Sequence, residues 1–369
     1  MTTLPVEDPR NALHVRPGVN ESHDGLPGAA FSRPAGHHHL RRTVSVEELA
    51  EGVLRGDRVM LARAITLVES NAPAHFEQAQ SLLTRLLPHT GGATRMGITG
   101  VPGAGKSTLI EALGMRLVEA GHRLAVTAVD PSSTITGGSI LGDKTRMERL
   151  SSHPAAFIRP SPSGGALGGV ARKTRETLLL FEAAGYDVVL VETVGVGQSE
   201  VTVRSMVDFF LLVLAPGAGD ELQGIKKGVV ELADAVLINK ADGASRNLAL
   251  MSRADYERAL HYLQPATEGW ITPALAASAV TGEGLSAVWE TVTAFLESTR
   301  QSGAFRQRRR DQEGAWMRAM VEEQLRERFF AHPQVAALLP ELDDAVQGGR
   351  LPAATAASRL LQAFDAHAG

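Results

Sequence analysis

Nine consecutive residues could bind the phosphates of a nucleoside triphosphate. Residues 100–108 read G-V-P-G-A-G-K-S-T, the G-x4-G-K-[ST] pattern of a phosphate-binding loop. Glycines let backbone N–H groups turn toward phosphate oxygens, a lysine adds positive charge, and a serine hydroxyl can bind Mg²⁺. The predicted nucleotide-binding residues of this loop are Gly103, Ala104, Gly105, Lys106, Ser107 and Thr108, and Lys106 is also a predicted catalytic residue.

The flanking residues favour this interpretation over a glycine turn without a ligand. Residues 95–99 carry apolar side chains at alternate positions, which is typical of a strand. After the loop, apolar residues recur at helical spacing, and Gly121 is a suitable helix end. The helical set comprises Leu109, Ile110, Leu113, Leu117 and Val118. The sequence therefore predicts a strand, a phosphate-binding loop and a helix in succession.

A second motif indicates which base is bound. The tetrad Asn239-Lys240-Ala241-Asp242 follows the apolar run 235–238. The carboxylate of Asp242 can accept hydrogen bonds from N1–H and the exocyclic amine of guanine, whereas adenine offers no matching pair. The tetrad alone also fits a solvated turn, but together with the upstream loop it favours guanine. Ser278 and Ala279 follow the strand-like run 271–277 and are predicted to form another base-contacting loop.

Three acids are candidates for a magnesium site. Asp130 follows the apolar run 124–129, Glu192 follows the run 187–191, and Asp143 lies in a glycine-rich segment. Ligands of doubly wound sheets bind at the carboxyl ends of the strands, so these acids and Ser107 could converge on one ion. We predict Ser107, Asp130, Asp143 and Glu192 as metal ligands, with Asp130 and Glu192 also catalytic. The alternative for each acid is a helix cap or a turn residue.

Alternation of strands and helices between residues 93 and 300 predicts an α/β fold with a doubly wound, mostly parallel sheet of the P-loop NTPase type. The capping box at Ser45 and the amphipathic periodicity that follows predict a helical segment over 44–92. We expect residues 1–43 to be a disordered leader, in which the triplet His37-His38-His39 is either a metal-binding element or a coincidence.

Residues 301–369 are expected to be a helical dimerisation region. Their basic cluster is Arg306, Arg308, Arg309 and Arg310. We interpret the arginines as a solvated helix face, with an acidic partner surface as the alternative. The apolar side chains that follow are predicted to form a packing or dimer seam, and they are Trp316, Met320, Leu325, Phe329 and Phe330.

Composition limits the environment and the partners of the chain. The sequence has no cysteine, so disulfides and cysteine-bearing metal sites are excluded. The formal net charge of −4 gives no reason to expect nucleic acid or an anionic membrane as a partner. The sequence shows neither a secretory signal pattern nor an apolar run of about 20 residues. We expect a cytoplasmic protein.

A glycine-dense segment, residues 217–228, follows a buried strand-like run and contains two acids and two lysines. It fits either a loop that rearranges with the nucleotide state or a rigid connection capped by Asp220. The predicted switch residues are Gly195, Gly217, Asp220, Lys226 and Lys227.

The combined motifs resemble the MeaB/ArgK-type GTPases, the accessory proteins of methylmalonyl-CoA mutase and related cobalamin-dependent acyl-CoA mutases. The resemblance covers about residues 46–330 and is carried by the segments 56–58, 62–70, 129–133, 137–147, 192–200 and 216–228. It implies a SIMIBI-class G domain, Mg²⁺ with GTP or GDP as ligand, and the four metal ligands named above. It also implies a mobile third switch over 217–228 and a homodimer built partly from the carboxyl-terminal helices.

By the same resemblance, the protein is a chaperone that gates transfer of adenosylcobalamin into the mutase and protects or reactivates that enzyme. No cobalamin site is visible in the chain, so the vitamin is expected on the mutase. Water is the expected nucleophile, and Lys226 and Arg146 are candidates for stabilising the transition-state charge. Two other functions stay open, a small-molecule or transport-linked kinase and a metal-insertion GTPase. The missing cysteines argue against the latter.

Overall fold

The computed structural model describes residues 44–129, 147–160, 167–193, 199–217 and 227–366. The elements below all belong to the unit Ser45–Gly369. Asp130, Asp143, Arg146, Gly195, Asp220, Lys226 and the triplet His37-His38-His39 lie outside the described residues.

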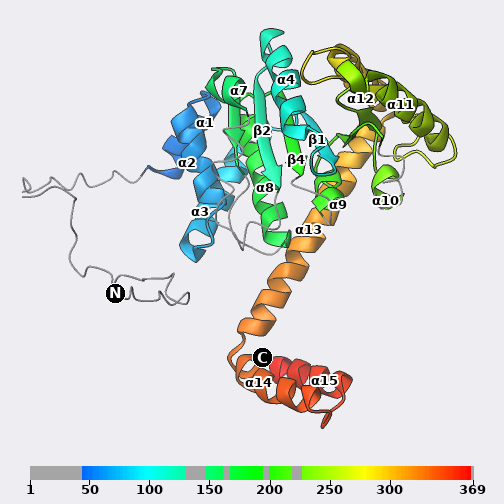
Figure 1. Ribbon diagram of the computed structural model, residues 1–369. Coiled ribbons are helices and arrows are strands. Elements are labelled where there is room, and N and C mark those ends of the chain that lie inside the picture. Colours follow the sequence, from blue (N-terminus) through cyan, green and yellow to red (C-terminus); the bar gives the residue numbers. More distant parts are fainter. Residues whose placement is uncertain (1–43, 130–146, 161–166, 194–198, 218–226, 367–369) are drawn as a thin grey trace, which may run out of the picture. The chain divides into compact units, whose positions relative to one another are not determined.

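The centre of the fold is a seven-stranded sheet with the strand order β3-β2-β4-β1-β5-β6-β7. Figure 1 shows β2, β4 and β1 in the middle of the fold, surrounded by helices. Every described strand pair is parallel. The predicted α/β class with a doubly wound sheet is therefore confirmed, and the sheet is more uniformly parallel than expected. The strands are β1 Thr94–Gly100, β2 Leu124–Val129, β3 Ala156–Arg159, β4 Val188–Thr193, β5 Phe209–Leu214, β6 Ala235–Ile238 and β7 Ala274–Ala276.

Helices cover both faces of the sheet, which explains why every residue of β2, β4, β5 and β6 is buried. On one face, side chains such as Met96 and Ile98 pack against α4 (Lys106–Glu119), α7 (Glu148–Ser152) and α12 (Leu285–Ser302). The opposite face carries α8 (Leu167–Ala183), α9 (Ser199–Arg204), α10 (Lys227–Val230) and α11 (Arg246–Leu260). A 3-10 turn, η3 (Gly243–Ser245), precedes α11.

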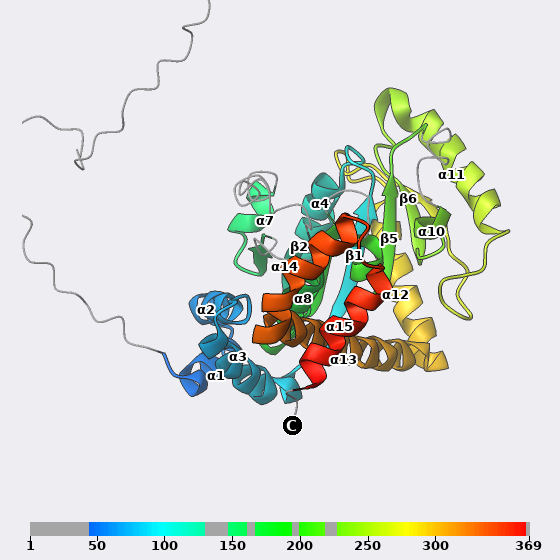
Figure 2. The same ribbon diagram turned by 90° about the horizontal axis from the view of Figure 1, so that it is seen from below.

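Three amino-terminal helices pack beside α8 (Figure 2). They are α1 (Val46–Leu54), α2 (Arg58–Val68) and α3 (Pro73–Leu86), followed by the 3-10 turn η1 (Leu87–His89). The predicted capping box is confirmed, because the Ser45 hydroxyl accepts the Glu48 N–H at 3.1 Å and the Glu48 carboxylate accepts the Ser45 N–H at 3.2 Å. Both bonds satisfy amides that would otherwise lack partners at the start of α1.

The carboxyl-terminal residues form three helices, α13 (Ala304–Ala331), α14 (Pro333–Gln347) and α15 (Ala353–Asp365). The 28 residues of α13 make a rod of about 42 Å, and none of them is buried. Leu325 is 56% exposed and Phe330 48% exposed, while Trp316, Met320 and Phe329 are half-buried. Within the described residues, no helix is both long and apolar enough to cross a membrane.

The interpretation of the arginine cluster as a solvated face is wrong for two of its members. Arg309 Nη2 lies 2.7 Å from Asp208 Oδ2, and Arg308 Nη1 lies 3.3 Å from Asp234 Oδ2. Both acids are buried at the amino ends of β5 and β6. Burial lowers the pKa of Arg309, but the hydrogen bond and charge of Asp208 outweigh it, so this pKa is raised. The two remaining arginines of the cluster are exposed as expected.

We expect Arg309→Met to lower the free energy of unfolding by about 3 kcal/mol, because it leaves the Asp208 carboxylate buried without its counter-ion. Arg310→Met is the matched control, since its side chain is exposed one position along the same helix. That control should change stability by less than about 0.5 kcal/mol. Urea denaturation followed by circular dichroism measures both, and equal stability of the two variants would contradict the assignment.

Candidate nucleotide-binding site

The phosphate-binding motif connects the end of β1 to the start of α4, as the sequence predicted. Two of its glycines are required by close contacts. A Cβ on Gly100, at φ 150°, would lie 2.0 Å from the Val213 carbonyl oxygen. A Cβ on Gly105, at φ 87°, would lie 2.7 Å from Asn239 Nδ2. Only glycine accepts this combination of left-handed backbone and missing space.

Lys106 is positioned over this loop. Its side chain is 8% exposed, and Nζ donates hydrogen bonds to the carbonyl oxygens of Gly100 at 2.8 Å and Val101 at 3.3 Å. The residue also begins α4, so its ammonium group and the amino-terminal amides of the helix share one region. Positive partial charge at a helix start and a full positive charge on lysine together favour an anion such as phosphate.

Ser107 and Glu192, two of the predicted metal ligands, are in contact. Ser107 Oγ donates to Glu192 Oε1 at 3.0 Å. Glu192 lies near the carboxyl end of β4, opposite Ile98 of β1 in the sheet register, and is 5% exposed. A hydroxyl and a carboxylate are oxygen ligands of the kind that Mg²⁺ prefers. The contribution of Asp130 and Asp143 to this site stays a prediction, because both lie outside the described residues.

A buried threonine pair beside this site was missed by the sequence reasoning. Thr193 Oγ1 donates to Thr99 Oγ1 at 2.8 Å, and both residues are fully buried. Thr99 precedes the phosphate-binding loop and Thr193 follows Glu192, so the bond ties the ends of two adjacent strands together. The sequence signal that could have predicted this pair is that Thr99 precedes the phosphate-binding loop and Thr193 follows Glu192.

The two predicted base-binding loops are linked to the phosphate-binding loop by Asn239. Its Nδ2 donates to the Ala104 carbonyl at 2.9 Å, and its Oδ1 accepts the Ala279 N–H at 3.2 Å. Asn239 is 1% exposed, so each group that it contacts is held out of water. Ser278 is also fully buried, and its Oγ accepts the N–H of Thr281 at 3.1 Å. A single carboxamide therefore fixes the relative position of three loops.

Lys240 and Asp242 are oriented by an unusual backbone. Lys240 has a positive φ of 58°. Among the described residues, every other residue with positive φ is a glycine. Such a conformation costs free energy and is common at ligand sites. The Ala241 N–H donates to the Ala277 carbonyl at 3.1 Å, which holds the tetrad against the neighbouring loop. The Asp242 carboxylate makes no capping hydrogen bond to the 3-10 turn that follows.

The predicted switch segment is described only at its ends. The Gly217 N–H donates to Ser252 Oγ of α11 at 3.1 Å, and Lys227 begins α10. Gly217 has φ 80°, a left-handed conformation that favours glycine. The roles of Gly217 and Lys227, and those of Gly195, Asp220 and Lys226, stay predictions.

Comparisons with known proteins agree with this geometry. The family model "Methylmalonyl Co-A mutase-associated GTPase MeaB" matches residues 61–334. A putative GTPase from Caulobacter vibrioides is 59% identical over 321 residues, covering 87% of this chain and 98% of the relative. The mouse protein named "Methylmalonic aciduria type A homolog, mitochondrial" is 46% identical, over 86% and 79% of the two chains. A crystal structure titled "LAO/AO transport system kinase" aligns with a TM-score of 0.70 and 38% identity, over 87% and 97%.

We expect Gly105→Ala to weaken GTP binding about tenfold or more, because the left-handed conformation costs about 1–2 kcal/mol and the new Cβ would displace Asn239. The matched control is Gly121→Ala. Gly121 also has positive φ, at 96°, but nothing lies within 4 Å of its added Cβ. Calorimetric titration with GTP measures both variants, and equal affinities would contradict the role of the Gly105–Asn239 contact.

Proposed function

We propose that the GTP cycle of this chain gates the loading of adenosylcobalamin into an acyl-CoA mutase. The basis is that the chain belongs to the MeaB family of methylmalonyl-CoA mutase-associated GTPases. The chain is a GTPase, as its relatives are named. The proposal adds that the nucleotide state controls the mutase and that the chain protects or reactivates it. The family match over residues 61–334 is the observation that carries the proposal.

The contacts around the nucleotide site support a hydrolytic mechanism. Lys106, the loop amides and the start of α4 would bind and orient the phosphates. Asp242 would recognise guanine, while Asn239 keeps its loop against the phosphate-binding loop. The hydroxyl and carboxylate of Ser107 and Glu192 fit a hard cation, and Mg²⁺ bound there would neutralise phosphate charge. Positioning and electrostatic stabilisation would supply most of the rate enhancement.

Helix α9 offers a route from the nucleotide to a partner surface. It begins seven residues after Glu192, and its far end is bonded to α13 and α8. Gln312 Nε2 of α13 donates to the carbonyl oxygens of Arg204 at 3.3 Å and Val207 at 2.9 Å. A change of position at the Glu192 end of α9 would therefore reach α13.

The surface of α13 supports a dimer or a partner contact. Met317, Val321 and Leu325 recur every four residues and are 60%, 51% and 56% exposed. Apolar side chains at this spacing form one stripe along a helix. We propose that this stripe contributes to a homodimer interface. The expected cytoplasmic location and the identity of the mutase stay predictions.

The test of the mutase proposal is the rate of GTP hydrolysis with and without purified methylmalonyl-, ethylmalonyl-, isobutyryl- or 2-hydroxyisobutyryl-CoA mutase. We expect one of these enzymes to raise the rate several-fold, because a switch protein completes its site when its partner binds. A cobalamin-independent enzyme at the same concentration is the control. Indifference to all four mutases would contradict the proposal while leaving the GTPase assignment intact.

We expect Glu192→Gln to slow GTP hydrolysis by about 10²-fold or more and to raise the Mg²⁺ concentration required, because the amide lacks the negative charge. Glu119→Gln is the control, since that residue is exposed at the other end of α4. Phosphate release is measured over a Mg²⁺ titration. A Glu192 variant that keeps the wild-type rate at every Mg²⁺ concentration would remove this carboxylate from the proposed site.

A kinase is the second candidate, since the aligned crystal structure is titled a transport system kinase. A kinase transfers the γ-phosphoryl group to an acceptor other than water. Incubation with γ-labelled GTP and no acceptor separates the two functions. Release of free labelled phosphate supports the hydrolase, and retention of the label on GTP until an amino acid is added would support the kinase.

A further inference from the structure

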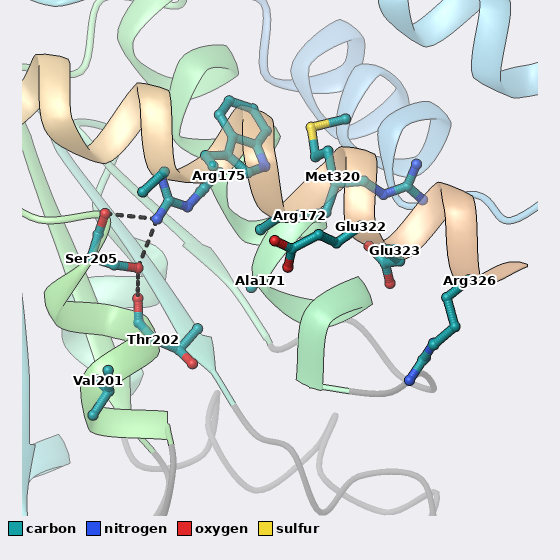
Figure 3. Close-up of a pocket in the computed structure, with 13 residues that line it drawn as sticks. Ala171, Arg172, Arg175, Val201, Thr202, Ser205, Met320, Glu322, Glu323 and Arg326 are labelled. Carbon is teal, nitrogen blue, oxygen red and sulfur yellow. Dashed lines mark hydrogen bonds between the residues drawn. The ribbon is translucent and has the colours of Figure 1, made fainter. Parts of the chain in front are cut away.

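A second cavity lies away from the nucleotide-binding loops, between helices α8, α9 and α13 (Figure 3). Its volume is about 680 Å³, which falls within the range of small-molecule sites. The thirteen lining residues comprise six apolar, two hydroxyl and five charged side chains, and seven of the thirteen come from α13. The apolar ones include Val201, Trp316 and Met320.

Arg175 is a largely buried cation among neutral acceptors. Its Nη2 donates to the backbone oxygen and to Oγ of Ser205, each at 2.7 Å (Figure 3). Its Nη1 donates to the Gln312 carbonyl at 3.2 Å. Within the described ranges, no carboxylate lies at ion-pair distance from this guanidinium. Burial, with a smaller effect of Arg95, lowers the pKa of Arg175 to about 10, and the charge of Glu313 offsets only part of this change. Buried charges are normally paired, so this site favours an anion.

The adjacent wall provides an apolar surface. The Trp316 ring centre lies 5.5 Å from Arg175 Cζ, so the ring packs beside the guanidinium. Met320 and Val201 extend the apolar surface, and Val201 is 62% exposed although it lines a cavity.

We propose that this cavity binds a small apolar anion. Its apolar body would pack against Trp316 and Met320, and its carboxylate or sulfonate would accept hydrogen bonds near Arg175. Charge complementarity supports an anionic occupant, because three arginines and two glutamates line the cavity. An uncharged molecule of the same shape would gain no charge-assisted hydrogen bond near Arg175 and would bind less well. The site is separate from the guanine and phosphate contacts.

The first experiment titrates the full chain with anilinonaphthalene sulfonate, an apolar anion, and with the uncharged N-phenylnaphthylamine. We expect one saturable site for the anion and at least tenfold weaker binding of the uncharged probe. Probe binding should quench tryptophan emission in the wild type and much less in Trp316→Phe, since Trp270 and Trp289 do not line the cavity. Equal affinity for both probes, or binding that does not saturate, would overturn the proposal.

Two variants test the location. Ala319→Trp should abolish saturable binding by filling the cavity, and this position tolerates a larger side chain because Ala319 is exposed. Arg175→Gln should weaken the anion at least tenfold and leave the uncharged probe unchanged. Gln324→Trp is the control, because Gln324 is exposed on α13, does not line the cavity and lies outside the apolar stripe of that helix.

GTP affinity, measured in parallel, reports that each variant is folded. If Ala319→Trp binds GTP normally and still binds the anion like the wild type, the site lies elsewhere and the proposal is wrong. Because GTP binding and probe binding are separate readouts, failure here leaves the proposed mutase function untouched.

Discussion

The candidate site depends on one constraint: the seven strands are parallel, so their carboxyl ends all lie on the same side of the sheet. Backbone pairing between β1 and β4 places Ile98 opposite Glu192, and pairing between β1 and β5 places the start of the phosphate-binding loop beside Val213. Residues more than 80 positions apart in the chain therefore meet within hydrogen-bond distance, as Ser107 and Glu192 do. The loops at this edge are then fixed to one another by side chains. Asn239 connects Ala104 to Ala279, and Thr99 connects to Thr193.

Much of this arrangement follows from local sequence patterns. A strand, a glycine-rich loop and a helix in succession leave few other conformations for residues 94–119, because Gly100 and Gly105 occupy positions where a Cβ would collide. The apolar runs that become β2 and β6 were predicted with the observed bounds, since strands buried on both faces have nearly continuous apolar sequences. In contrast, β3 was not predicted. It has four residues, is only partly buried and ends in Arg159, so it lacks the long apolar signal of the central strands.

The contacts that sequence reasoning missed are those that join distant segments through polar side chains. The spacing of Arg308 and Arg309 on α13 resembles an ordinary solvated face, and nothing in that stretch indicates which acids lie opposite. Asp208 is 101 positions from Arg309, and Asp234 is 74 positions from Arg308. Each acid lies at the start of an apolar strand, where a surface residue is the usual expectation. Only the packing of α13 against the amino ends of β5 and β6 makes these four residues neighbours.

Helix α9 connects the carboxyl ends of the strands to their amino ends. This helix follows the Glu192 strand at the carboxyl edge, and the chain then enters β5 at the amino edge, where Arg309 binds Asp208. Breaking the buried Arg309–Asp208 ion pair would be costly, so α13 would move together with the amino end of β5 rather than slide over it. Gln312 holds the end of α9 to the same helix. A displacement at the nucleotide would therefore be expressed as a change in the angle or position of α13, which carries an exposed apolar stripe suited to a partner. Under the proposed function, the attachment of α13 at the amino ends of the strands would let a change at the carboxyl ends reach a partner.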